Sequence, residues 1–178
     1  MNERLHIAVR DLVWRIISAV ALSAASCAAL AAGAIGFQAG TTDGGITLGA
    51  GRAVDQNYTV IGGRLGYFVA DGFELAMSAQ AWRGADPVIY KFIPEVRYIW
   101  YQSEPVQPYV AGFYSFNIYQ GLPDKNSYGA KGGIYFPVGP NASLSLGLVY
   151  EAIESCNSAV YRECSDWYPE IGFLVTFR

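Results

Sequence analysis

The residues best suited to chemistry in this sequence are charged side chains that interrupt otherwise apolar segments. They are Arg64, Glu74, Lys91, Glu95, Arg97, Lys131, Glu151 and Glu170. Two carboxylates such as Glu151 and Glu170 could act as general acid and base. Four positive and four negative groups in one interior could instead form ion pairs, because unpaired charges are costly to bury. We expect the second role, with Lys91, Lys131, Glu151 and Glu170 in one ionic layer and the other four in another.

Other catalytic groups are scarce. The one histidine, His6, lies near the start of the chain, so neither a Ser/His/Asp nor a Cys/His arrangement can be built downstream. No histidine and cysteine cluster has the spacing of a zinc site, and "GAKGG" (129–133) lacks the spacing of a phosphate-binding loop. We therefore predict no catalytic residues, no metal and no cofactor.

The segment that positions three of these charges is "YKFIPEVRYIW", residues 90–100. Its even positions carry mostly aromatic residues, and its odd positions carry Lys91, Glu95 and Arg97. A period of two is typical of a β-strand, whereas a helix would need spacings of three and four. Pro94 cannot donate a ladder hydrogen bond, so we expect a β-bulge there.

The same period recurs along the chain and predicts eight strands. They cover residues 45–52, 59–69, 73–82, 88–101, 107–118, 127–137, 142–152 and 167–177. Short turns such as "ADG" (70–72) and "VGPN" (138–141) alternate with longer polar loops. This alternation predicts an antiparallel up-and-down meander of even strand number, which can close without leaving an edge.

Residues 1–34 have the pattern of a secretory signal peptide. Three arginines precede the apolar, alanine-rich run "IISAVALSAASCAALAAGA", which contains small-x-small cleavage sites. An uncleaved membrane anchor or a lipoprotein modified at Cys27 are the alternatives. Residues 35–178 would then form the mature domain, with 9 basic and 13 acidic residues, a balance that does not favour nucleic acid.

Two cysteines remain in the mature domain, Cys156 and Cys164, in a polar segment. In an exported protein, two nearby cysteines predict a disulfide; free thiols are the alternative.

Composition indicates which face of the barrel is outside. Charged residues make up 15% of the chain, where a soluble domain averages about 25%, and apolar residues make up 52%. A soluble lipocalin-like barrel would have to pack its apolar rings into a narrow interior, whereas the opposite faces carry small residues that fit there. Aromatic residues also gather near strand ends, as in an interfacial girdle: Tyr67, Trp82, Trp100, Tyr101, Tyr150, Trp167 and Phe177. We predict an all-β, eight-stranded antiparallel transmembrane β-barrel.

The sequence resembles the small eight-stranded outer-membrane barrels of Gram-negative bacteria, of the OmpA transmembrane-domain, OmpX and OmpW type. The resemblance rests on "GRLGYFVADGFELAMSAQ", "VQPYVAGFYSF" and "YFPVGPNASLSLGLVYE". It implies a monomer in the bacterial outer membrane, with outer-membrane lipid and lipopolysaccharide as neighbours and the barrel-assembly machinery as a partner during insertion. Members usually end on an aromatic residue, whereas this chain ends with Phe177 followed by Arg178.

Several barrels of this size are lipid A deacylases or palmitoyl transferases that use histidine as base, which the mature domain lacks. We therefore expect a non-enzymatic, envelope-structural protein, or limited passage of small solutes through a charge-plugged lumen. The alternative is a surface-binding barrel that acts through its loops, above all through Tyr161, Arg162 and Glu163 between the two cysteines.

Overall fold

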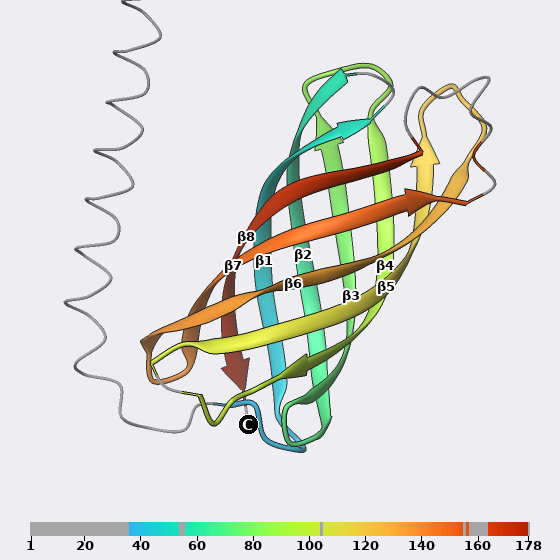
Figure 1. The fold of residues 1–178 in the computed structure, drawn as a ribbon. Coiled ribbons are helices and arrows are strands. Elements are labelled where there is room, and N and C mark those ends of the chain that lie inside the picture. The colour runs from blue at the N-terminus through green and yellow to red at the C-terminus, as the bar shows by residue number, and fades with distance from the viewer. Residues whose placement is uncertain (1–35, 54–55, 104, 155, 157–163, 178) are drawn as a thin grey trace, which may run out of the picture.

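The chain folds into a closed antiparallel β-barrel (Figure 1). The computed structural model describes residues 36–53, 56–103, 105–154, 156 and 164–177. The strands are β1 (Thr42–Ala53), β2 (Gln56–Ala70), β3 (Phe73–Arg83), β4 (Ile89–Ile99), β5 (Gln107–Tyr119), β6 (Lys125–Gly139), β7 (Ala142–Ile153) and β8 (Ser165–Phe177). Each strand pairs with its neighbour in sequence, and β1 closes the barrel on β8. The predicted fold class of eight antiparallel up-and-down strands is confirmed. The predicted signal peptide, residues 1–34, lies outside the described residues.

The strands alternate between a buried and an exposed face, as the period of two predicts. In β4, Lys91, Glu95 and Arg97 are buried, whereas Phe92 and Tyr98 are 50% and 40% exposed. The same alternation holds in β7 and β8. Large apolar side chains therefore cover the outside of the barrel, and charged side chains lie inside it.

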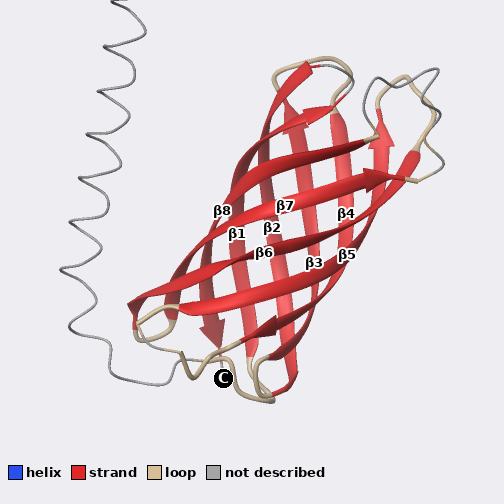
Figure 2. Cartoon of the chain, in the orientation of Figure 1, coloured by secondary structure: helices blue, strands red, loops and turns tan. Residues whose placement is uncertain are grey.

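No helix in the described ranges is long and apolar enough to cross a membrane. Figure 2 shows this part of the chain as strands joined by loops and turns.

The prediction of a bulge at Pro94 is wrong. β4 pairs with β5 in one register on both sides of Pro94, from Phe92 opposite Phe116 to Glu95 opposite Phe113. Pro94 still pairs with Met77 of β3. Because Pro94 has no N–H, the β4–β5 ladder has a local gap at this position, but no extra residue is inserted as in a β-bulge. The bulges that do occur lie beside turns, at Phe68/Ala70 and Pro137/Gly139.

The interior holds more large rings than the sequence suggested, and Trp82 is one of them. We assigned Trp82 to the outer aromatic girdle, but it is 1% exposed and points into the barrel. It packs edge-to-face on Tyr168, with 5.2 Å between ring centroids. There is room for it because Gly51, on a neighbouring stretch of β1, has no side chain: a Cβ at Gly51 would lie 2.5 Å from the indole ring.

Candidate functional site

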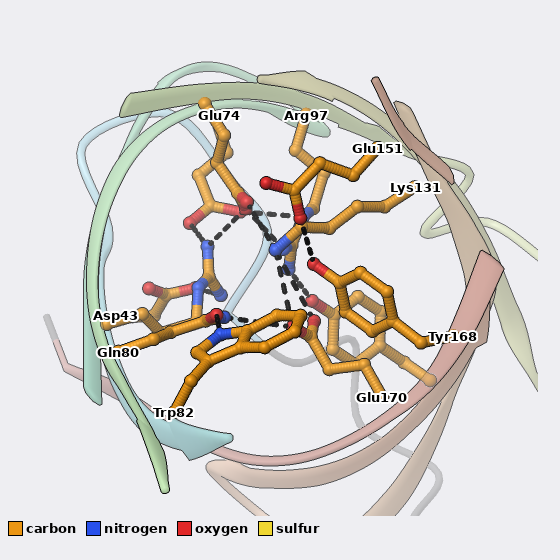
Figure 3. Close-up of polar contacts among 12 residues, drawn as sticks. Asp43, Glu74, Gln80, Trp82, Arg97, Lys131, Glu151, Tyr168 and Glu170 are labelled. Atoms are coloured by element: carbon orange, nitrogen blue, oxygen red, sulfur yellow. Dashed lines mark hydrogen bonds and ion pairs between the residues drawn. The ribbon is translucent and has the colours of Figure 1, made fainter. Parts of the chain in front are cut away.

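In the part of the chain that the structure describes, the barrel interior contains nine buried charged residues, which we call the ionic network. It comprises the eight predicted residues and Asp43. Every strand except β5 contributes at least one of them, and none of the nine side chains is more than 8% exposed. Figure 3 labels six of these side chains, which extend from the wall of the barrel into its interior: Asp43, Glu74, Arg97, Lys131, Glu151 and Glu170.

Arg64 and Arg97 anchor the half of the network nearer the turns. Nη1 of Arg64 donates to Oδ2 of Asp43 at 3.2 Å, and Nη2 donates to Oε1 of Glu74. Arg97 donates through Nη2 to Oε1 of Glu95. Because Arg64 Nη2 also lies 3.6 Å from Glu95 Oε1, the two guanidinium groups share this carboxylate.

Lys91 and Glu151 anchor the half nearer the loops. The Nζ of Lys91 lies 2.7 Å from both carboxylate oxygens of Glu151. Tyr168 donates to Oε2 of Glu151 at 2.9 Å, and Ser127 donates to Oε1. The ammonium group of Lys91 also lies 3.8 Å from the centroid of the Trp82 ring, where a cation is attracted to the ring face.

Lys131 connects the two halves. Its Nζ lies 3.0 Å from Glu95 Oε2 and 3.4 Å from Glu170 Oε2. Gln80 donates to the same Glu170 oxygen at 3.3 Å. The two separate ionic layers that we predicted are therefore joined, because Lys131 reaches a carboxylate in each.

Asp43 is the charged residue that the sequence analysis missed. The predicted first strand began at residue 45, whereas β1 begins at Thr42. Extending the period of two by one step from Gly45 would have placed Asp43 on the inward face. With Asp43 included, the ionic network has five carboxylates and four cations, so it carries one more negative than positive group.

Two apolar clusters lie beside the network, one toward each end of the barrel, and the loop-end one is interleaved with it, because Ile93 lies between Lys91 and Glu95 on the inward face of β4. Toward the loops are Tyr58, Val60, Trp82, Ile89, Ile93, Phe113, Val149 and Tyr168. Toward the turns are Phe37, Phe68, Ile99, Tyr109, Tyr135 and Leu174. Arg97 joins the turn-end cluster to the network, because its guanidinium stacks over Tyr109 at 4.8 Å and donates to the Tyr135 hydroxyl.

The turn-end cluster includes a residue that precedes β1. Phe37 packs against Phe68 and Tyr135, with centroids 5.6 and 5.5 Å apart. Its carbonyl accepts a hydrogen bond from Gly72 N–H at 2.8 Å, in the turn between β2 and β3. Residues 36–41, which we call the cap segment, therefore close the turn end of the interior.

The remaining site predictions concern cysteines, metals and loops. A disulfide joins Cys156 and Cys164, as predicted. Among the described residues, no group of three histidine, cysteine or acidic side chains is placed to hold a metal ion. Tyr161, Arg162 and Glu163, the predicted binding residues, and Arg178 lie outside the described residues.

Comparison with known proteins shows similarity of structure without similarity of sequence. No protein-family model matches the chain, and no curated protein matches its sequence. The crystal structure of Neisserial surface protein A (NspA) is similar, with a TM-score of 0.58 and 15% identity over 77% of this chain and 96% of that one. The N-terminal β-barrel domain of OprF from Pseudomonas aeruginosa gives 0.57 and 18%, over 76% and 97% of the two chains. A de novo designed transmembrane β-barrel gives 0.55 and 19%, over 80% and 100%. The chain thus has the fold of the small outer-membrane barrels that its sequence resembles.

Proposed function

We propose that this protein is a non-enzymatic barrel of the bacterial outer membrane whose interior is closed, and that it serves the envelope as a structural element. The placement in a membrane is supported by the outward apolar face. Leu65, Tyr128 and Trp167 are 68%, 54% and 62% exposed, on β2, β6 and β8. Such side chains around a barrel match the lipid-facing band of outer-membrane proteins.

The proposal that the interior is closed rests on the buried charged and apolar side chains that fill the barrel. The ionic network contacts apolar rings toward both ends of the barrel, through Arg97 with Tyr109 and Tyr135 and through Lys91 with Trp82. Eight strands leave an interior only wide enough for side chains. A conducting path would need groups in all three regions to move.

The barrel's chemistry favours structure over catalysis. Each acidic group of the ionic network has at least one cationic partner within 4.0 Å. A general acid or base needs access to a substrate and to protons. Because these carboxylates are buried and paired, we assign them to holding the strands together.

The test is conductance of the refolded mature protein in a planar bilayer, with Lys91→Ala and Glu170→Ala variants alongside. We expect silent membranes for all three proteins, with folding verified by heat-modifiable mobility on gels. Discrete openings of the wild-type protein that either substitution alters would instead establish limited passage of small solutes. If the closed-barrel proposal holds, replacing residues 153–165 then tests for a surface-binding role of the disulfide loop.

A further inference from the structure

The outward face of the barrel carries charge at two positions. Among the strand residues that the structure describes, Arg52 on β1 and Arg83 on β3 are the only charged ones on the outward face; the other charges on the strands have inward parity. Both are exposed, both are arginines, and both lie at the loop end of their strands.

The two arginines flank the same strand. Thr59 of β2 lies opposite Arg83 on one side and opposite Ala50 on the other, and Asn57 lies opposite Arg52. Arg83 and Arg52 are thus two strand spacings apart across the sheet and offset by two residues along the strands. Their Cα atoms are therefore roughly 12 Å apart. Two arginine side chains can meet over that distance, and the residues between them, Asn57 and Thr59, are polar. We call these four residues the β1–β3 patch.

The height of the patch matches a lipid headgroup. Leu48 and Ile61, just below it, are 48% and 54% exposed and belong to the apolar band. Trp167 lies beside Arg52, because the adjacent Asp166 accepts a hydrogen bond from Arg52 N–H at 3.0 Å. Trp167 is 62% exposed and contacts Tyr150, with ring centroids 4.9 Å apart. Exposed tryptophan and tyrosine of this kind mark the level of the membrane interface.

The guanidinium groups are available to a ligand. In the described ranges, neither one forms an ion pair or a side-chain hydrogen bond, in contrast to Arg64 and Arg97 inside the barrel. Among the described residues, two acids near this end of the barrel are Asp166 and Asp86. Asp166 already accepts from the backbone N–H groups of Arg52 and Trp167. Asp86 lies in the loop after β3, and its backbone carbonyl accepts a hydrogen bond from the side-chain amide of Gln56.

From these observations we infer that the β1–β3 patch binds the phosphate of a lipid headgroup in the leaflet at the loop end of the barrel. This inference rests on the proposed membrane location. Arginine suits the task because its planar guanidinium donates two parallel hydrogen bonds to phosphate oxygens and is always charged. In an outer membrane the longer loops face outward, so the ligand would be a phosphorylated glycolipid of the outer leaflet.

The test is native mass spectrometry of the folded barrel in detergent, titrated with diphosphoryl lipid A and, separately, with lipid A stripped of both phosphates. The variants are Arg52→Gln with Arg83→Gln, and Lys125→Gln as the matched control. Lys125 is also a cation at the loop end of its strand. It pairs with Asn117 and lies on the inward-facing side of β6, away from the β1–β3 patch. All these positions are at least partly exposed, so we expect the variants to fold.

We expect the wild-type barrel and the Lys125→Gln variant to bind diphosphoryl lipid A roughly 25-fold more tightly than the stripped lipid, since each of the two arginines contributes roughly fivefold at a membrane surface. The double variant should lose that preference. Equal affinity of the double variant and wild type for the diphosphoryl form would overturn the inference. A separate arm, insertion of wild-type protein into liposomes with heat-modifiable mobility, tests the membrane location itself. Insertion without phosphate preference rejects the patch alone, and absence of insertion rejects the proposed function.

Discussion

At the scale of single residues, Glu95 is the group on which the ionic network depends most. Its carboxylate lies within 4.0 Å of Arg64, Arg97 and Lys131. Glu95→Gln keeps the size of the side chain but leaves three buried cations with one fewer partner. We expect the free energy of unfolding to fall by about 3–5 kcal/mol, since breaking a buried pair leaves uncompensated charge. Urea unfolding in lipid vesicles, followed by tryptophan fluorescence, measures it.

Asp43→Asn is the matched control and a prediction in its own right. It makes the same change of charge in the same network, but Asp43 pairs only with Arg64, which Glu74 also contacts. Because the interior has five carboxylates and four cations, we expect the unfolding free energy to change by less than about 1 kcal/mol. If the two variants lose equal stability, net charge rather than specific pairing sets the stability of the network.

Which charged residues lie inside could be predicted from the sequence, but their partners could not. Parity places Lys91, Glu95 and Arg97 inward because a strand alternates strictly. Partner choice depends on the stagger between strands and on side-chain reach, neither of which parity determines. Lys131, for example, contacts Glu95 on β4 as well as Glu170 on β8. Trp82 shares the inward parity of Glu74 on β3, but the space for its ring comes from Gly51, two strands away, which parity does not reveal.

At the scale of the elements, β2 must pass close to the carboxylates that it helps to position. A Cβ at the inward Gly66 would overlap Oε1 of Glu74 and Oδ1 of Asp43, both of which surround Arg64. We expect Gly66→Ala to destabilise the barrel by about 1–3 kcal/mol, because overpacking here displaces the ion pairs. The control is Gly112→Ala on the outward face of β5, where a Cβ meets nothing within 4 Å. Chemical denaturation of both variants in vesicles gives the comparison, and equal losses would contradict the proposed crowding.

The cap segment, residues 36–41, is an element that no period in the sequence predicted. It has no strand alternation, and it is held by Phe37 in the turn-end cluster and by Ala39 N–H, which donates to Asp71 at 2.9 Å. We expect Phe37→Ala to lower the unfolding free energy by about 3 kcal/mol through the cavity it leaves. Asp71→Asn, which weakens the hydrogen bond without opening a cavity, should cost less than about 1.5 kcal/mol. Stability that is unchanged in Phe37→Ala would show that the cap segment does not pack in solution.

At the scale of the whole molecule, three groups of side chains obstruct the interior: the turn-end cluster, the ionic network and the loop-end cluster. An ion that passes one of them still meets the other two. Removing a single obstacle should therefore leave the barrel silent, which separates this design from a pore with one gate. The three groups are in contact with one another, because Arg97 lies over Tyr109 and Lys91 lies over Trp82.

Bilayer recordings of single and combined variants test this arrangement. We expect Phe37→Ala, Glu95→Ala and Trp82→Ala each to give no discrete openings, because each leaves most of the filled interior in place. The triple variant should conduct if its heat-modifiable mobility shows that the barrel still forms. Steady openings from any well-folded single variant would mean that one region alone blocks the lumen. The protein would then be closer to a gated channel than to a structural barrel, since a change at one site would suffice to open it.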